Sequence, residues 1–242
     1  MSVSAPYGSL DATGNRLTKS LRAPSLVAGT ALLLMAVLSA WGNFGILENL
    51  ITTGDTAKTV ADISASEALF RMGVAALVAV VVLDVIVAAA LFEVFESVDR
   101  GLSMMAAWFR LAYSAVFLVA ICRLLEVPAL LKNDGGQAVR MLDAFDATWK
   151  VGLVLFAVHL LLIGYLAYRS GFMARIFGVL LTIAGLGYLA DGFATILVPD
   201  FPFGFAVFVF GGEVALMFWL LIRGRQVRVP ADSSPVPGKD MP

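Results

Sequence analysis

Six ionisable side chains interrupt long apolar stretches of this sequence, and they are the residues best placed to do chemistry. They comprise two arginines, one histidine and three carboxylic acids: Arg71, Asp84, Arg110, His159, Asp191 and Glu213. A charge at the centre of a transmembrane helix costs about 2.5–3.5 kcal/mol on insertion scales, so such residues face the interior of a helix bundle and pair there. The six residues therefore predict an intramembrane polar network.

The depth of each residue suggests which of them meet. At a helical rise of about 1.5 Å per residue, Arg110 and Asp84 lie at similar heights on adjacent antiparallel helices, which predicts an ion pair between them. Glu213 is the alternative partner of Arg110, and it lies at about the same depth as His159. Because the acids outnumber the arginines, one carboxylate is either protonated or shares Arg110 with another acid.

Two functions remain open for such a network. It can be an internal ionic clamp that fixes the register of the helices, or it can line a polar cavity that binds a substrate or relays protons. Gly211 and Gly212 precede Glu213 and leave space beside its carboxylate, which favours a cavity. The alternative explanation of these glycines is close helix packing, which is common in membranes.

Other intramembrane chemistry lacks the residues that it needs. The chain has one histidine, His159, and one cysteine, Cys122, whereas bis-histidine haem ligation needs two histidines and zinc hydrolases use two or three. No nucleophile, phosphate-binding or dinucleotide-binding motif occurs in a usable context. We therefore expect no catalytic residues, no metal and no cofactor, and we do not expect an enzyme.

The composition defines the surroundings of these residues. Of 242 residues, 60% are apolar and only 14% are charged, and the mean hydropathy is +0.90. Soluble domains carry about 25% charged residues, so this composition excludes a soluble globular enzyme and a disordered chain. The net charge of -1 leaves no basic field for nucleic acid. The expected partner is the lipid bilayer, with room for an unidentified small ligand and no indication of oligomeric state.

The apolar stretches predict an all-α polytopic membrane protein, a bundle of six transmembrane helices. Each stretch is close to the length of about 20 residues that a crossing needs, and none shows the alternation of a barrel strand. The predicted spans cover residues 25–47, 67–95, 102–125, 148–168, 176–198 and 205–222. None contains a proline, which argues against discontinuous helices of the transporter type.

Basic residues predict the direction of the spans. Ten lie on one face: Arg16, Lys19, Arg22, Arg100, Arg169, Arg175, Arg223, Arg225, Arg228 and Lys239. Four lie on the other: Lys58, Lys132, Arg140 and Lys150. Cytoplasmic loops are enriched in lysine and arginine, so we expect a multi-pass protein of the plasma membrane (a bacterial inner membrane) with both termini in the cytoplasm.

The remaining segments complete the expected organisation. Residues 1–23 form a cytoplasmic N-terminal tail, residues 24–224 the six-helix domain and residues 225–242 a disordered cytoplasmic tail. We expect residues 48–66 to form a polar surface loop. Residues 126–147 contain either a short amphipathic helix on the outer leaflet or a plain connector. Four aromatic residues are typical of an interfacial belt: Tyr165, Tyr168, Tyr188 and Trp219.

Several short patterns in the last four spans resemble one family of membrane proteins. They are Phe109-Arg110-Leu111, the turn at residues 168–171, the run at residues 183–189 followed by Asp191, and Gly212-Glu213 followed by residues 219–224. In order and spacing they resemble the DUF4386 family of bacterial integral membrane proteins, over about residues 20–224. The resemblance implies the fold and the membrane location but no activity. Family members often carry an acid soon after the arginine of the third span, where this chain has Ala112, Tyr113 and Ser114.

Together these observations predict an integral membrane protein without an assignable biochemical activity, structural or regulatory, with an internal ionic network. The alternative is a small-molecule transporter or binding protein with a polar intramembrane cavity around Arg110 and Glu213.

Overall fold

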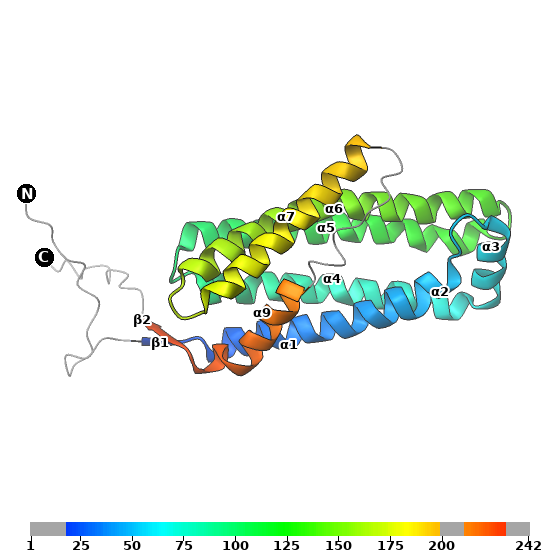
Figure 1. The fold of residues 1–242 in the computed structure, drawn as a ribbon. Coiled ribbons are helices and arrows are strands. Elements are labelled where there is room, and N and C mark those ends of the chain that lie inside the picture. Colours follow the sequence, from blue (N-terminus) through cyan, green and yellow to red (C-terminus); the bar gives the residue numbers. More distant parts are fainter. Residues whose placement is uncertain (1–17, 199–210, 231–242) are drawn as a thin grey trace, which may run out of the picture.

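A computed structural model of the chain describes residues 18–198 and 211–230, and these form a helical bundle (Figure 1). The long helices are α1 (Arg22–Ser39), α4 (Glu67–Phe95), α5 (Arg100–Leu130), α6 (Gly135–Arg169) and α7 (Arg175–Leu197). The shorter elements are a π-helix η1 (Ala40–Leu47), α2 (Glu48–Leu50), α3 (Thr56–Ala65), α9 (Gly211–Ile222), a 3-10 turn η2 (Gly224–Gln226) and the strands β1 (Thr18–Ser20) and β2 (Arg228–Pro230).

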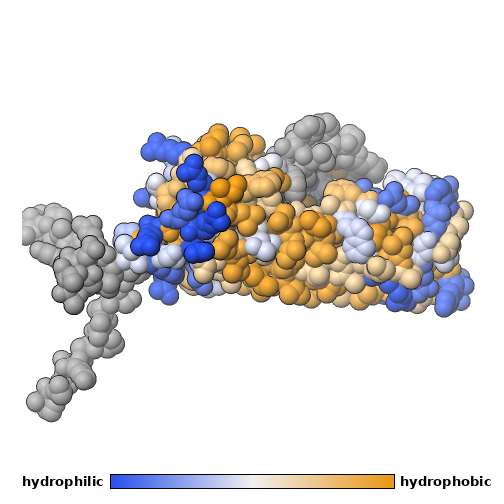
Figure 2. All heavy atoms as spheres, turned by 90° about the horizontal axis from the view of Figure 1, so that it is seen from below, coloured by the Kyte–Doolittle hydropathy of each residue, from blue (hydrophilic) through white to orange (hydrophobic). Residues whose placement is uncertain are grey.

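Five continuous helices are long and apolar enough to cross a membrane. They are Arg22–Leu50, which joins α1, η1 and α2, together with α4, α5, α6 and α7. Hydrophobic side chains cover the middle of the molecule in Figure 2, and hydrophilic ones gather at its two ends. The chain is thus an all-α, multi-pass membrane protein, as its composition predicts. Of the sixth predicted span, residues 205–210 lie outside the described part, and α9 forms the rest.

The helices pack in a closed ring that follows the order of the sequence. Helix α1 packs on α4, α4 on α5, α5 on α6, α6 on α7, α7 on α9, and α9 returns to α1. Each crossing helix therefore has one face toward its neighbours and one toward the surroundings. Residues on the inward faces of different helices, such as Asp84 and His159, can consequently meet inside the ring.

Glycines allow close approach at most seams of the ring. On α7, a Cβ atom at Gly178 would lie 2.6 Å from the carbonyl oxygen of Gly164 on α6. A Cβ atom at Gly42 would lie 3.2 Å from the carbonyl oxygen of Gly73, where η1 crosses α4. Similar contacts join α9 to α7 at Gly212. Small residues at such crossings let helix backbones pack directly, which is how membrane helices associate.

Both described ends of the chain meet at one end of the bundle. Strands β1 and β2 pair antiparallel, with Ser20 opposite Arg228 and Lys19 opposite Val229 (Figure 1). Leu21 is 1% exposed, and its amide donates to the carbonyl oxygen of Val227 at 3.0 Å. We call this pairing of residues 18–21 with residues 227–230 the terminal clasp. The prediction that disorder begins at residue 225 is wrong, because η2 and β2 continue the fold to Pro230; residues 231–242 lie outside the described part.

Two predicted loops are more helical than the sequence analysis expected. Residues 135–147 are the first turns of α6 and neither a separate helix on the outer leaflet nor a plain connector, because Asp134 caps this helix by accepting from the amide of Gln137 at 2.9 Å. Residues 56–65 form α3, which packs against α6. Helix α5 extends beyond the predicted limit at residue 125 and contains Pro128 in its last turns.

Candidate intramembrane polar site

An ion pair between Arg110 and Asp84 joins α5 to α4 in the interior of the bundle. A terminal nitrogen of Arg110 lies 2.5 Å from Oδ1 of Asp84, and the two side chains are 2% and 1% exposed. The pair is the one that helix depth predicts. Arg110 is the largest of the described side chains that are almost fully buried. Because a buried charge without a partner is very unfavourable, each residue requires the other.

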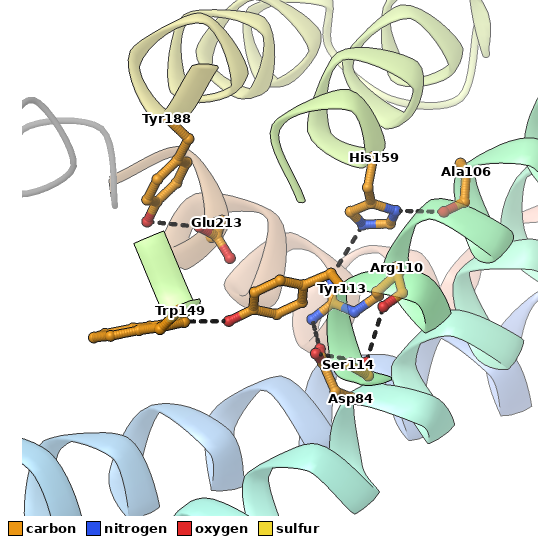
Figure 3. Close-up of polar contacts among 9 residues, drawn as sticks. All are labelled: Asp84, Ala106, Arg110, Tyr113, Ser114, Trp149, His159, Tyr188 and Glu213. Atoms are coloured by element: carbon orange, nitrogen blue, oxygen red, sulfur yellow. Dashed lines mark hydrogen bonds and ion pairs between the residues drawn. The ribbon is translucent and has the colours of Figure 1, made fainter. Parts of the chain in front are cut away.

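Ser114 extends this ion pair by one turn of α5. Its hydroxyl lies 3.0 Å from Oδ2 of Asp84 and 2.9 Å from the carbonyl oxygen of Arg110, and it can donate its single proton to one of them at a time (Figure 3). Thus the acid that pairs with Arg110 is Asp84 of the neighbouring helix α4. Ser114, which follows Arg110 on α5, binds the same acid.

His159 on α6 connects the pair to a third helix. Nη1 of Arg110 lies 3.1 Å from Nε2 of His159, and Nδ1 of His159 lies 2.9 Å from the carbonyl oxygen of Ala106 (Figure 3). A guanidinium group can only donate, and a carbonyl oxygen can only accept. Nε2 must therefore be the acceptor, and Nδ1 must carry the proton. His159 is neutral in this arrangement, and its tautomer is fixed by its two neighbours.

An aromatic ring covers the remaining face of Arg110. The guanidinium carbon lies 5.2 Å from the centre of the Phe156 ring, within the range of a cation–π interaction. Phe156 also stacks on His159, with ring centres 5.7 Å apart. Nε of Arg110 is buried and has no hydrogen-bond partner among the described residues. Protein atoms therefore enclose the whole polar group. We call it the buried clamp, and it consists of Asp84, Arg110, Ser114 and His159.

A second polar pair lies beside the clamp and involves α7 and α9. The hydroxyl of Tyr188 donates to Oε1 of Glu213 at 3.3 Å, and Figure 3 shows this pair apart from Arg110. Glu213 is half-buried and makes no ion pair with a described residue, although the charges of Arg110 and Asp84 act on it. Asp191 is half-buried on α7 and interacts electrostatically with Tyr188. The alternative pairing of Arg110 with Glu213 is therefore not the one observed.

Arg71 does not join the buried group, contrary to the predicted network. It forms an ion pair of 2.8 Å with Glu67 one turn earlier on α4, and its side chain is 59% exposed. The position near the end of the span explains this outcome, because a long cationic side chain there reaches the polar boundary.

Some interior residues were not expected from the sequence. Trp149 on α6 donates to the hydroxyl of Tyr113 at 3.0 Å, and Tyr113 packs on Phe156 with ring centres 4.9 Å apart. Tyr188 and Trp219 are each 8% exposed, so their assignment to an interfacial belt is wrong. The mostly apolar sequence around each of them does not define how its helix is rotated, and the packing shows that these rings turn inward.

Two grooves occur among the described residues, and no residue of the clamp lines either of them. Both follow the seam between α4 and α5, and they are lined by apolar side chains such as Val78 and Leu125 in one and Val85 and Trp108 in the other. These four side chains are exposed, whereas Phe70 and Leu124, at the base of the first groove, are buried. Among the residues described, no three His, Cys, Asp or Glu side chains are grouped in a way that would hold a metal ion.

Comparison with known proteins assigns the chain to a family. The profile of the family described as "Domain of unknown function (DUF4386)" matches residues 27–224, so the protein belongs to this family. It is also similar to an uncharacterised protein of the archaeon Archaeoglobus fulgidus, with 32% identity over 148 residues, which are 61% of this chain and 81% of the archaeal protein. The search of solved structures found no match. The proteins to which this chain is similar thus include an archaeal protein, in addition to the family of bacterial proteins that its motifs resemble.

Proposed function

We propose that this protein acts as a structural or regulatory component of the membrane and that its buried clamp holds α4, α5 and α6 in a fixed register. The observation that carries this proposal is the seam between α4 and α5. The glycine contacts described at other seams do not occur between these two helices, and both ends of the seam are grooved. The Asp84–Arg110 ion pair joins the two helices in the interior, at the level where the second groove ends at Val85 and Leu111.

The two charges of the clamp depend on each other energetically. Removing one member of a buried ion pair typically costs about 3–5 kcal/mol, because the other charge is left without compensation. Ser114 and His159 satisfy further donors and acceptors of the pair. A second hydrogen bond, from the hydroxyl of Ser103 to the carbonyl oxygen of Phe92 at 3.0 Å, joins the same two helices nearer the terminal clasp.

We also propose that the protein lies in the plasma membrane with six crossings and both termini in the cytoplasm. Because the terminal clasp places Ser20 and Arg228 at the same end of the bundle, the chain between them must cross the membrane an even number of times. Five long helices and a sixth crossing that includes α9 would meet this requirement. The excess of arginine at the end that carries the clasp supports its cytoplasmic location. Reporter fusions after Ile222 should report the cytoplasm, and fusions near residues 55 and 135 should report the outside; the reverse result would refute this orientation.

A cysteine-labelling experiment tests whether the clamp is dry. Ser114→Cys, made in a Cys122→Ala background, introduces a thiol at a site that is 2% exposed. A small charged methanethiosulfonate reagent should leave this thiol unmodified in the folded protein and should modify it after denaturation in detergent. Ser97→Cys, at an exposed turn, is the matched control and should be labelled in both states. Rapid labelling of Ser114→Cys in the folded protein would refute a dry clamp.

One observation favours a second function. Glu213 is half-buried and hydrogen-bonded by Tyr188, so a carboxylate outside the clamp is available inside the ring. A small-molecule transporter or binding protein would use this group as part of a polar cavity with Arg110. Labelling of Ser114→Cys in the folded state would favour this function over the structural one.

A further inference from the structure

We propose that Arg169 and Arg175, at the turn between α6 and α7, bind the headgroup of an anionic phospholipid. The two arginines end one membrane helix and begin the next, and both are exposed. Within the described part of the chain, neither lies within ion-pair distance of a carboxylate, although the charge of Asp99 acts on Arg169 from farther away. Two cationic groups at the end of a membrane helix thus remain available to a phosphate.

Tyrosine rings hold both guanidinium groups in position. The guanidinium carbon of Arg169 lies 5.7 Å from the centre of the Tyr165 ring, and Nη1 of Arg169 donates to the Tyr165 hydroxyl at 2.9 Å. Arg175 lies over the ring of Tyr168 on the preceding helix, 5.4 Å from its centre. A guanidinium group has five N–H donors, and Arg169 uses one of them on Tyr165. Stacking uses none, so both arginines keep donors for a bidentate contact with phosphate.

The turn that carries the two arginines is fixed to the bundle. Gly171 has a φ of +70°, which reverses the chain within a few residues and which other residues rarely adopt. Phe172 stacks on both Phe95 and Trp219, with ring centres 6.1 and 6.0 Å apart, and Met173 is 3% exposed. The two cationic groups are therefore ordered before a ligand arrives, which lowers the entropy cost of binding.

An apolar stripe continues from Arg175 along α7 and fits the acyl chain of the same lipid. Exposed side chains recur at intervals of three and four residues, which places them on one face of the helix. They are Ile176, Val179, Ile183 and Leu186. A cationic headgroup site followed by an exposed apolar stripe matches the chemistry of an anionic phospholipid better than that of a free anion.

Binding of phosphatidylglycerol to the full-length protein in neutral detergent tests this proposal. Native mass spectrometry should show at least about tenfold tighter binding of phosphatidylglycerol than of phosphatidylcholine with the same acyl chains, since each arginine near a membrane surface contributes on the order of 1 kcal/mol. The double variant Arg169→Gln/Arg175→Gln should lose this preference. Its melting temperature without added lipid should match that of the wild type, because both side chains are exposed.

A matched control separates a site from a general attraction to positive charge. Arg223→Gln/Arg225→Gln removes the same charge from exposed positions next to the clasp, at the same end of the bundle, and should retain phosphatidylglycerol binding within about twofold of the wild type. Equal losses in the two double variants would overturn the proposed site. Displacement of phosphatidylglycerol by millimolar inorganic phosphate would also overturn it, because that result would identify a free-anion site.

Discussion

Arg110 donates to Nε2 of His159 across the interface of α5 and α6, at a distance of 3.1 Å. This contact fixes the protonation of the imidazole ring, because the opposite nitrogen faces the carbonyl oxygen of Ala106. His159 is the only histidine in the chain. It therefore reports on the clamp without interference from any other imidazole.

Nitrogen-15 NMR of the histidine-labelled protein should detect this tautomer directly. We expect a neutral ring at pH 7, with a proton on Nδ1 and none on Nε2, because the guanidinium group of Arg110 has no lone pair to accept a bond. The Arg110→Met variant serves as the comparison, since it removes the donor to Nε2. A wild-type spectrum with a proton on Nε2, or with both nitrogens protonated, would contradict the hydrogen bonds described for His159.

The α6–α7 seam should be sensitive to one added methyl group. In Gly178→Ala the new Cβ atom would lie 2.6 Å from the carbonyl oxygen of Gly164, so the helices must move apart. We expect a loss of about 1–3 kcal/mol in the free energy of unfolding, as for other overpacked sites. Unfolding in mixed micelles of sodium dodecyl sulfate and a neutral detergent measures this loss.

Gly101→Ala is the control for that substitution. Gly101 lies in the first turn of α5, and its nearest contact would be a side-chain oxygen of Asp99 at 3.5 Å, which is ordinary van der Waals contact. This variant should be neutral or slightly more stable, because alanine is the better helix former. Equal destabilisation by the two variants would show that the close approach of α6 and α7 is not what determines the effect.

Cysteines placed across the terminal clasp should form a disulfide. Ser20 and Arg228 are directly opposite in the antiparallel pair, where Cα atoms are about 4.5–5.5 Å apart and suit a disulfide bond. In a Cys122→Ala background, oxidation of Ser20→Cys/Arg228→Cys should give an intramolecular cross-link, detected by a shift in gel mobility that reductant reverses.

The control for this cross-link pairs distant positions. Ser20→Cys/Thr56→Cys joins the clasp to the start of α3, at the other end of the bundle in Figure 1, and should give no intramolecular product. A cross-link in this control, or none across the clasp, would contradict the meeting of the two ends.

The sequence predicts the long elements better than the contacts between them. The span at residues 67–95 has the same bounds as α4, since its apolar run is bordered by polar residues at both ends. The Asp84–Arg110 pair follows from depth alone, because the two residues lie on helices joined by a short turn. Arg71 shows the limit of that argument: Glu67, one turn away on the same helix, was the nearer partner.

The rotation of each helix about its axis could not be read from the sequence. Tyr188 and Trp219 lie in mostly apolar stretches. One charged residue lies within a turn of each, Asp191 and Arg223, and a single charge does not define the inward face of a helix. The contact between His159 and Arg110 depends on the same rotation in α5 and α6. Packing contacts between helices decide this rotation, as at Gly178 and Gly185 of α7, where the backbone lies close to α6.

The coupling free energy between Asp84 and Arg110 tests the central claim most directly. Unfolding in mixed micelles should show losses of about 3–5 kcal/mol for Asp84→Ala and for Arg110→Ala separately. The double variant should lose less than the sum, with a coupling of about 2–3 kcal/mol. Arg123→Ala, which removes an exposed arginine of the same helix, should change stability by less than about 1 kcal/mol. Additive losses for Asp84 and Arg110, or no loss in Arg110→Ala, would contradict a clamp that holds the bundle together.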